Sequence, residues 1–408
     1  MFERKNMIVQ APVFSMSGYG RHSQDIVMAF FNSGKYNVSV VPFQWGQSSL
    51  WQAEKEIDDA LIFMTNNKIS DGSEFIFVKV GVPHEFRKIS STCNIGITAG
   101  LEVEQYPAKW GEYCNQMTAV IVPTNFAKER LIACGTTVPI FVVPEGIDTK
   151  VFNPTTPTDV NASGIWPTLD QIPTKFNFLT VGQWLPGPVG EDRKNIPATA
   201  MAVISALLDN TDVGIVCKTF INNMSSPDRY ALFERFKSAF GEKAANRVHV
   251  IHGILTDQEM QHLYVHPKIR AFLSLTHGEG YFRPLAEAMA CDLPVIVTGW
   301  SGHMDYVNQE LATTIGYDMT QVPPSAWQPD LLGQGQTWAN PVFEEAENRI
   351  RRCYNGYKVA KDRAVKMGVI MREKWSLEAA DKLLDETMDQ ILATSNTNSA
   401  SMSERIIV

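Results

Sequence analysis

The feature of this sequence that most constrains its fold is a series of short, predominantly apolar segments that alternate with segments of helical periodicity. In the first part of the chain these runs lie at residues 7–9, 38–41, 75–80, 94–100, 119–123 and 140–144. Apolar runs without polar alternation are typical of strands buried on both faces, as in parallel sheets. Strands that alternate with helices therefore predict a doubly wound α/β domain.

The same alternation restarts after an irregular stretch, which predicts a second domain of the same kind. The later apolar runs lie at residues 176–182, 213–218, 248–253, 269–275 and 294–299. Residues 156–174 are rich in Pro, Thr, Asn, Asp and Gly and lack periodicity, so we expect a linker there. This gives domains at residues 1–155 and 175–374, and a chain of 408 residues exceeds what one hydrophobic core usually organises.

The last part of the chain predicts one further helix, over residues 375–392. Ala379, Leu383, Leu384, Met388 and Leu392 recur there at helical spacing. Residues 393–408 are rich in Ser and Asn, and we expect a disordered tail.

Composition excludes several classes of protein. Apolar residues make up 44% and charged residues 20%, as in ordinary globular proteins, and the net charge of −8 disfavours a protein that coats nucleic acid. Six cysteines without a CxxC pair predict no metal site and no metal cofactor. No apolar window reaches the length of a membrane span, and the N-terminal residues lack the pattern of an export signal, so we expect a cytoplasmic protein with reduced thiols.

The segment His277–Tyr306 carries the most informative chemistry. It follows an apolar run and enters a helix near Pro284. Gly280 allows backbone amides to approach a ligand closely, and the helix start favours an anion. Glu279 and Glu287 lie eight residues apart in the sequence, and each carboxylate accepts hydrogen bonds from hydroxyl groups of a ligand. Taken alone, Glu287 could equally complement the helix dipole at the surface, and Glu279 could be a loop charge.

A second constellation, Val181–Pro197, strengthens the functional interpretation. A strand ends at Gly182, a loop rich in Gly and Pro follows, and Arg193 and Lys194 precede the next helix. Ligands of open α/β sheets bind at the carboxyl ends of strands, and a cation there stabilises a departing diphosphate. Lys218, at the end of the neighbouring strand, is a lesser candidate at the same edge.

The first domain contributes weaker candidates. Gly18 and Gly20 lie in SGYG between the first strand and the first helix, where backbone amides could face a phosphate, although any tight turn can require glycine. Glu102 and Glu104 follow a strand, and one of them could reach an acceptor hydroxyl. Solvated loop charges explain these two carboxylates slightly better.

At this point the residues resemble a known family, the retaining glycosyltransferases of family 4, which have the GT-B fold. The family's E-x7-E motif matches Glu279 through Glu287, followed by AMACDLPVIVT. The stretches PTNFAKERL, VVPEGID, RKN and TWANP also resemble the family, so the likeness covers residues 7–392. It implies two Rossmann-like domains with parallel sheets facing across a cleft, and a C-terminal helix that crosses back to the first domain.

The resemblance also implies roles for individual residues. Glu287 would bind the ribose hydroxyls, Glu279 the donor sugar and Lys194 the diphosphate. The glycine loop with Gly18 and Gly20 would lie near the phosphates. Glu102 occupies a position where related enzymes have a carboxylate. The predicted catalytic residues are Lys194, Glu279 and Glu102, and the predicted donor-binding residues are Gly18, Gly20, Arg193, Lys218, Gly280, Tyr281, Phe282 and Glu287.

Two departures from the family pattern bear on the donor. Gln183 stands where the family often has an arginine, so one phosphate-binding cation is missing unless Arg193 replaces it. The motif is commonly E-G-F-G, and this chain has Phe282 in place of the last glycine. We expect the larger side chain to narrow or reshape the sugar pocket.

The resemblance implies a retaining, metal-independent transfer of a sugar from a UDP- or GDP-sugar to the hydroxyl of a saccharide-type acceptor, with no cofactor. One alternative is a glycosyltransferase acting on hydroxymethylated bases of viral DNA, which would make this a viral protein in a host cytoplasm. A second is a protein that binds nucleotide sugars without catalysis. A third is a nucleotide-sugar epimerase.

Overall fold

The computed structural model describes residues 4–46, 55–160, 164–185, 187–222 and 225–403, and these form two compact units. Unit 1 comprises Met1–Leu101, Gln105–Gly146 and Leu377–Val408. Unit 2 comprises Ile147–Ser376 together with the short segment Glu102–Glu104. The division thus falls after Gly146 and after Ser376, whereas the sequence placed the corresponding boundaries at residues 155 and 374.

Unit 1 is built on a parallel sheet of six strands in the order β2-β1-β3-β4-β5-β6. The strands are β1 (Lys5–Ala11), β2 (Tyr36–Pro42), β3 (Ile76–Val80), β4 (Cys93–Ile97), β5 (Ala119–Val122) and β6 (Ile140–Val142). All residues of β3, β4 and β5 are buried, and apart from Lys79 and Asn94 these strands are apolar without alternation.

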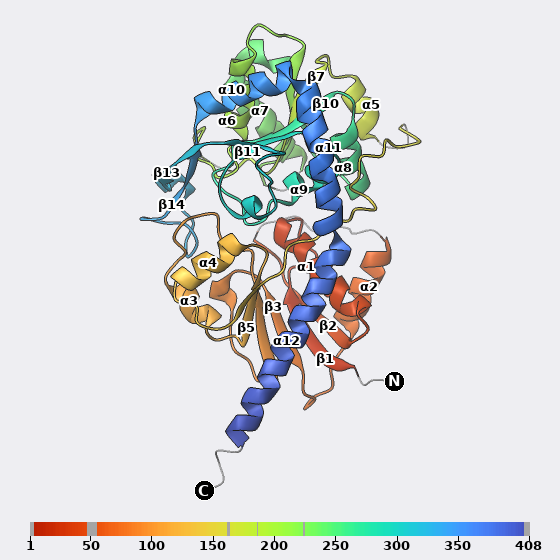
Figure 1. The fold of residues 1–408 in the computed structure, drawn as a ribbon, viewed down its shortest axis with the longest axis vertical. Helices are drawn as coiled ribbons and strands as arrows, with labels where there is room; N and C mark the ends of the chain where they lie inside the picture. The colour runs from red at the N-terminus through yellow and green to blue at the C-terminus, as the bar shows by residue number, and fades with distance from the viewer. Residues whose placement is uncertain (1–3, 47–54, 161–163, 186, 223–224, 404–408) are drawn as a thin grey trace. The chain divides into compact units, whose positions relative to one another are not determined.

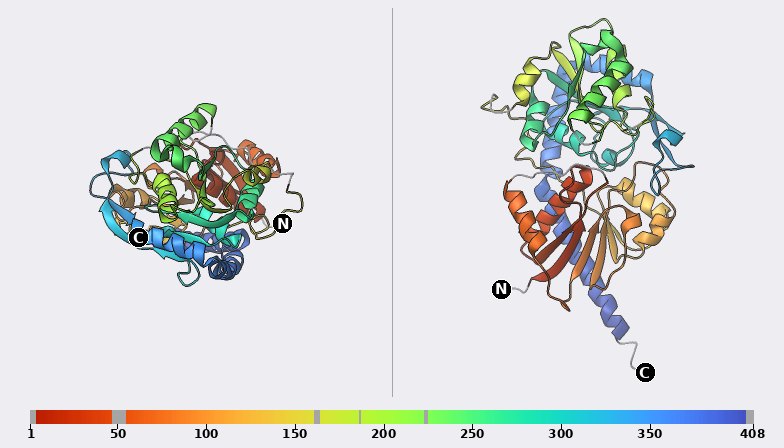
Figure 2. Two further views of the ribbon diagram at one scale, coloured as in Figure 1. Left: turned by 90° about the horizontal axis from the view of Figure 1, so that it is seen from above. Right: turned by 180° about the vertical axis from the view of Figure 1, so that it is seen from behind.

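Helices cover this sheet (Figures 1 and 2). They are α1 (Gly18–Asn32), α2 (Lys55–Asn66), α3 (Lys109–Cys114), α4 (Asn125–Ala133) and α12 (Leu377–Ser403), with a short 3₁₀ turn at Pro83–Glu85. Thr124 caps α4, since its hydroxyl accepts a hydrogen bond from the Ala127 amide at 3.3 Å. Leu384 and Met388 of α12 are buried with Val27 of α1 in the core of unit 1, so the C-terminal helix belongs to this unit.

The helix α12 extends past Leu392 to Ser403, into the segment for which the composition predicted disorder. A helix that is already nucleated by packing continues at little cost, because each added residue gains a hydrogen bond. The end of that segment, residues 404–408, lies outside the described residues.

Unit 2 repeats the architecture with a sheet in the order β12-β11-β10-β7-β8-β9, again parallel throughout. The strands are β7 (Phe176–Val181), β8 (Val213–Lys218), β9 (Val248–Ile251), β10 (Ile269–Ser274), β11 (Val295–Thr298) and β12 (Thr313–Ile315). A separate antiparallel hairpin joins β13 (Tyr317–Gln321) and β14 (Thr337–Pro341). The sequence did not predict this hairpin, because TWANP contains a proline and most of β13 is exposed.

The helices of unit 2 pack on both faces of its sheet. They are α5 (Ile165–Asp170), α6 (Ile196–Ala206), α7 (Ser226–Ala245), α8 (Asp257–Val265), α9 (Arg283–Ala290), α10 (Phe343–Asn355) and α11 (Tyr357–Lys374), with 3₁₀ turns at Gly302–Asp305 and Pro324–Ala326. Residues 156–174, expected as a linker, contain α5, whose Ile165 and Leu169 are buried in unit 2. Residues 161–163 of that stretch lie outside the described residues.

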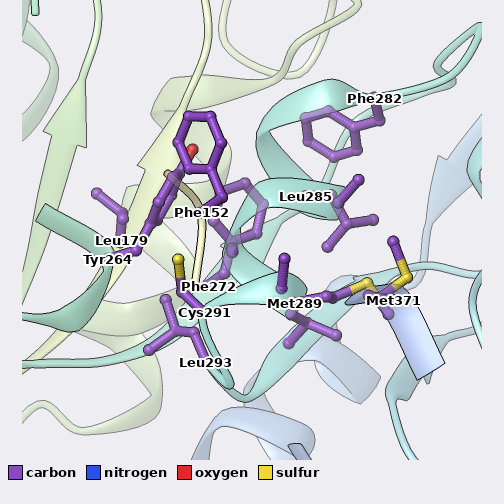
Figure 3. Packing of buried hydrophobic residues seen from close by; sticks show 14 of the residues in the cluster. Phe152, Leu179, Tyr264, Phe272, Phe282, Leu285, Met289, Cys291, Leu293 and Met371 are labelled. Carbon is purple, nitrogen blue, oxygen red and sulfur yellow. The ribbon is translucent and has the colours of Figure 1, made fainter. Parts of the chain in front are cut away.

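Two apolar clusters fill the faces of the unit 2 sheet. One includes Leu179 and Phe272 of the strands, Leu285 and Met289 of α9, and Met371 of α11 (Figure 3). The other lies on the opposite face, around Phe178, Ile215 and the helices α6 and α10. Successive residues of a strand, such as Phe178 and Leu179, thus belong to different clusters, because their side chains point to opposite faces of the sheet.

The predicted fold class is confirmed, since both units are α/β with six parallel strands. Within the described part of the chain, no helix is both long and apolar enough to cross a bilayer. All six cysteines are described and none forms a disulfide. No group of three or more His, Cys, Asp or Glu side chains among the described residues has the geometry to hold a metal ion.

Candidate functional site

The candidate site lies in unit 2, at the carboxyl ends of β7 and β10. Lys194 follows the loop after β7, and Asn195 precedes the first residue of α6. The segment between β10 and α9 carries Glu279. The amide of His277 donates to the Arg193 carbonyl at 2.9 Å, which joins the two loops directly. The sequence therefore placed both constellations correctly at one edge of the sheet.

Four charged side chains meet at this edge. The Lys194 Nζ lies 2.6 Å from Glu279 Oε2, and the Arg193 guanidinium lies 3.4 Å from the same oxygen. Arg193 also lies 3.0 Å from Glu102 Oε1. Glu102 thus contacts Arg193 although it follows a strand of unit 1 in the sequence. The two cations and two carboxylates compensate one another in charge.

Because these side chains are largely shielded from solvent, the ionisation of each one depends strongly on the charges of the others. Glu279 is only 3% exposed, and the hydroxyl of Thr276 donates to its Oε1 at 3.0 Å. Burial by itself would raise the pKa of Glu279, but Lys194 and Arg193 together lower it, so this carboxylate is ionised at neutral pH. Burial lowers the pKa of Lys194 and raises the pKa of Glu102. The pair Lys194–Glu279 is therefore costly to separate unless another charge replaces one partner.

The backbone around this cluster adopts conformations that glycine favours, at residues that are not glycine. Asn195 has φ 52° and ψ 36°, Phe282 has φ 75° and ψ 61°, and Ser301 has φ 85° and ψ −162°. Each such residue costs about 1–3 kcal/mol, and strain of this kind is concentrated at functional sites. Three non-glycine residues with positive φ therefore lie in or beside the segments that carry Lys194 and Glu279.

Phe282 directs its ring into the interior, although the sequence predicted that it would narrow the sugar pocket. The ring is 5% exposed, lies 5.7 Å from the ring of Phe272 and belongs to the cluster drawn in Figure 3. Lys194 Nζ lies 5.5 Å from its centroid. Tyr281 is likewise buried, at 2% exposed, so these two side chains offer little surface to a ligand.

Glu287 lies on α9, outside the cluster of four charges. The hydroxyl of Tyr264 donates to its Oε2 at 3.0 Å, and Arg283 lies 3.6 Å from its Oε1. The carboxylate is 9% exposed, so it is not the dipole-complementing surface residue of the alternative interpretation.

Lys218 and Gln183 lie at the adjoining strand ends. The Lys218 ammonium donates to the Gly253 carbonyl at 2.7 Å, and burial lowers its pKa to about 8. Gln183 donates through Nε2 to the Ile221 carbonyl at 2.6 Å, so it fixes the loop after β8. The residue that replaces the family's arginine therefore makes a structural hydrogen bond.

In unit 1 the glycine loop forms the turn into α1. Ser17 caps the helix by accepting the Gly20 amide at 3.0 Å. A Cβ at Gly20 would collide with the Ser15 carbonyl oxygen, whereas a Cβ at Gly18 would meet nothing within 4 Å. Packing alone explains Gly20, and Gly18 remains open to a ligand.

The sequence analysis did not predict the residues that hydrogen-bond the main chain of Glu279 and of the residues after it. The Ser301 hydroxyl accepts the Glu279 amide at 2.8 Å, and the Gly302 amide donates to the Glu279 carbonyl at 2.9 Å. Tyr306 donates to the carbonyls of Tyr281 and Phe282 at 2.8 and 2.9 Å. The only sequence signal was GWSG at a strand end, and this motif does not predict that its serine has a positive φ.

Comparison with known proteins was made at the level of sequence and of structure. No protein-family model and no curated protein matches the sequence. Solved structures do match. The chain is similar to Anabaena HepE in complex with UDP and glucose, with a TM-score of 0.64, 12% identity, and coverage of 95% of this chain and 100% of that one.

Two further structures give the same result. Sucrose-phosphate synthase from Thermosynechococcus elongatus has a TM-score of 0.65 at 12% identity and covers 96% of this chain and 100% of its own. A glycosyltransferase from Rickettsia africae has a TM-score of 0.63 at 14% identity and covers 96% and 99%. At these identities the likeness defines the fold, which is that of the GT-B glycosyltransferases.

Proposed function

We propose that this protein is a glycosyltransferase that moves a sugar from a nucleoside diphosphate sugar to an acceptor hydroxyl, with retention at the anomeric carbon. The observation that carries the proposal is the ion pair between the partly exposed Lys194 and the buried Glu279, at the carboxyl edge of a sheet whose fold matches sugar-transferring enzymes. The HepE structure holds UDP and glucose, which supports a UDP-sugar as the first donor to test.

The chemistry follows from the charges at this edge. The bond between the anomeric carbon and the diphosphate oxygen breaks, and a new bond forms from the acceptor oxygen to the same face of that carbon. The acceptor proton passes to the departing phosphate oxygen. Lys194 stabilises the negative charge that grows on the leaving group, and Glu279 orients the sugar hydroxyls.

Donor binding changes the partners of Lys194. Within the cluster the charge of Lys194 is compensated by Glu279 at 2.6 Å. A diphosphate brings negative charge to Lys194, which leaves the Glu279 carboxylate available to hydrogen-bond the sugar. Arg193 holds Glu102 and Glu279 in place during this exchange, with its guanidinium 3.0 and 3.4 Å from them. We assign Glu287 to the ribose hydroxyls and Lys218 to the nucleotide, and we assign no metal to the reaction.

A panel of nucleotide sugars tests the proposal. Ligand binding to the folded state raises apparent thermal stability, so UDP-, GDP- and ADP-sugars are compared by thermal unfolding of the full chain. The donor that stabilises the protein most is then incubated with glycan, lipid and hydroxymethylated-DNA acceptors, and NMR reads the anomeric configuration of the product. Stabilisation without transfer or hydrolysis would instead identify a non-catalytic binding protein, and donor interconversion without acceptor would identify an epimerase.

A further inference from the structure

Ser301 adopts a backbone conformation that is otherwise almost confined to glycine. Its φ of 85° and ψ of −162° fall in the region where a Cβ clashes with its own backbone. It is also 5% exposed, so its hydroxyl must find its hydrogen-bond partners within the protein. A glycine at this position would remove the strain, so the serine side chain must supply something that a glycine lacks.

The hydroxyl of Ser301 supplies an acceptor to the loop that carries Glu279. The Glu279 amide donates to it at 2.8 Å, and the Glu279 carbonyl accepts from Gly302 at 2.9 Å. A Cβ at Gly302 would collide with the Gly280 carbonyl, so the two backbones are in direct contact. Both main-chain groups of Glu279 are thus bonded to this one segment.

His303 orients that hydroxyl. Its Nε2 lies 2.8 Å from the Thr298 carbonyl, which accepts only, so Nε2 carries the proton and Nδ1 is the acceptor. Burial lowers the pKa of His303, which favours this neutral ring. Nδ1, 3.5 Å from the Ser301 hydroxyl, is thus available to accept its proton, which would leave a hydroxyl lone pair for the Glu279 amide.

We propose that Ser301, oriented by His303, is a positioning residue for the donor sugar, because its hydroxyl fixes the backbone from which the Glu279 carboxylate reaches Lys194 and the sugar. The proposal rests on the donor-binding role of Glu279. It adds a residue that touches no substrate and acts through Glu279 alone. Binding of the nucleotide itself, which the proposal assigns to other residues, does not depend on it.

Two substitutions separate the hydroxyl from the strain. Ser301→Ala removes the hydroxyl and keeps a Cβ in the strained conformation, whereas Ser301→Gly removes both. Asp330→Gly is the matched control, because Asp330 is an exposed loop residue of unit 2 that also has a positive φ, 63°. It relieves backbone strain without touching the cluster.

The first measurement needs no ligand. Hydrogen exchange of the full chain, resolved to the peptide over residues 277–281, reports the Glu279 amide. We expect exchange at this amide to become at least about tenfold faster in both Ser301 variants and to be unchanged in Asp330→Gly, because one hydrogen bond is lost only in the former. Wild-type protection in Ser301→Gly would overturn the proposal, whether or not the protein binds any nucleotide sugar.

The second measurement compares UDP with UDP-glucose by calorimetric titration. We expect Ser301→Gly to unfold at a temperature no lower than the wild type, yet to bind UDP-glucose about five- to tenfold more weakly, while UDP affinity changes less than about twofold. Equal losses for both ligands, or no loss for either, would overturn the positioning role. If the wild type binds neither UDP nor UDP-glucose, the choice of UDP-sugar donor fails, and hydrogen exchange still decides whether Ser301 holds Glu279.

Discussion

The two units share one α/β architecture, but the residues near the carboxyl edges of their sheets differ in backbone conformation. In unit 1, every described residue with positive φ is a glycine, and the turn into α1 is explained by the contact of Gly20 with Ser15. Among the described residues of unit 2, five that are not glycine have positive φ, and Asn195, Phe282 and Ser301 lie in or beside the segments that carry Lys194 and Glu279. The strained non-glycine residues are thus all in one of two similar folds, and the proposed reaction places its catalytic charges in that same unit.

The largest effect expected is on turnover when the unit 2 cluster loses its cation. Lys194→Ala removes the charge that stabilises the leaving group, so we predict a loss of kcat of at least about a hundredfold. Arg193 still faces Glu279 in this variant and compensates part of its charge. Steady-state kinetics with the donor found in the thermal panel, together with a thermal unfolding control, measures this. Near-normal transfer by Lys194→Ala would remove the assignment.

The next prediction compares the two glycines, Gly18 and Gly20, at the turn into α1 of unit 1. Gly20→Ala forces a Cβ against the Ser15 carbonyl, and we expect a loss of about 2–3 kcal/mol in stability. Gly18→Ala meets open space and should change stability by no more than about 0.5 kcal/mol. Denaturant unfolding of the two variants provides the comparison. If Gly18 approaches the donor phosphates, its alanine variant binds donor more weakly while remaining stable; unchanged affinity argues against that role.

Strain at Phe282 predicts a smaller effect with a defined direction. Both Phe282→Ala and Phe282→Gly empty the same part of the apolar cluster, so both are destabilised. Only the glycine variant escapes the cost of the left-handed backbone, and we expect it to be more stable than the alanine variant by about 1 kcal/mol. Equilibrium unfolding of the pair isolates this difference. An alanine variant as stable as the glycine variant would mean that position 282 carries no strain.

The smallest expected effect is a pH dependence in unit 1. Burial, with Asp25 and Glu378 nearby, raises the pKa of Asp381 from 3.8 to about 6. The folded state then gives up this proton at higher pH than the unfolded state, so stability falls as pH rises from about 4 to about 6. The lowered pKa of Glu279 has the opposite effect, since its stabilisation is lost as pH falls.

We expect Asp381→Asn to remove this decrease in stability with rising pH. We expect it to stabilise the protein by about 0.5 kcal/mol at pH 7 and by nothing at pH 4, a small value because solvent screens a half-buried carboxylate. Denaturant unfolding at the two pH values measures the difference. A less stable variant at pH 7 would show that the ionised carboxylate of Asp381 has a stabilising partner.

Most strands of the two sheets could be predicted from sequence because they are largely buried, as in Val213–Lys218, where every residue is buried. The edge strand β12 (Thr313–Ile315), which is only partly buried, was not predicted. The convergence of Lys194 and Glu279 could also be predicted, since the carboxyl ends of parallel strands meet at one edge. The helix Ile165–Asp170 was missed because its three buried residues lie among turn-forming ones.

The conformations of Ser301 and Phe282 could not be predicted. They are imposed by contacts between segments distant in sequence, such as Gly302 against Gly280, and local propensity opposes them. The partner of Glu102 was equally hidden, because Arg193 lies far from it along the chain.

The most direct test of the account is a hydrogen-exchange map of the full chain with and without saturating UDP-glucose. The account predicts that bound donor slows exchange in the peptides that contain Lys194, Glu279 and Glu287, and that Lys194→Ala weakens this protection at equal donor concentration. Protection confined to peptides outside these segments, with the Glu279 loop exchanging as in the free protein, would contradict it.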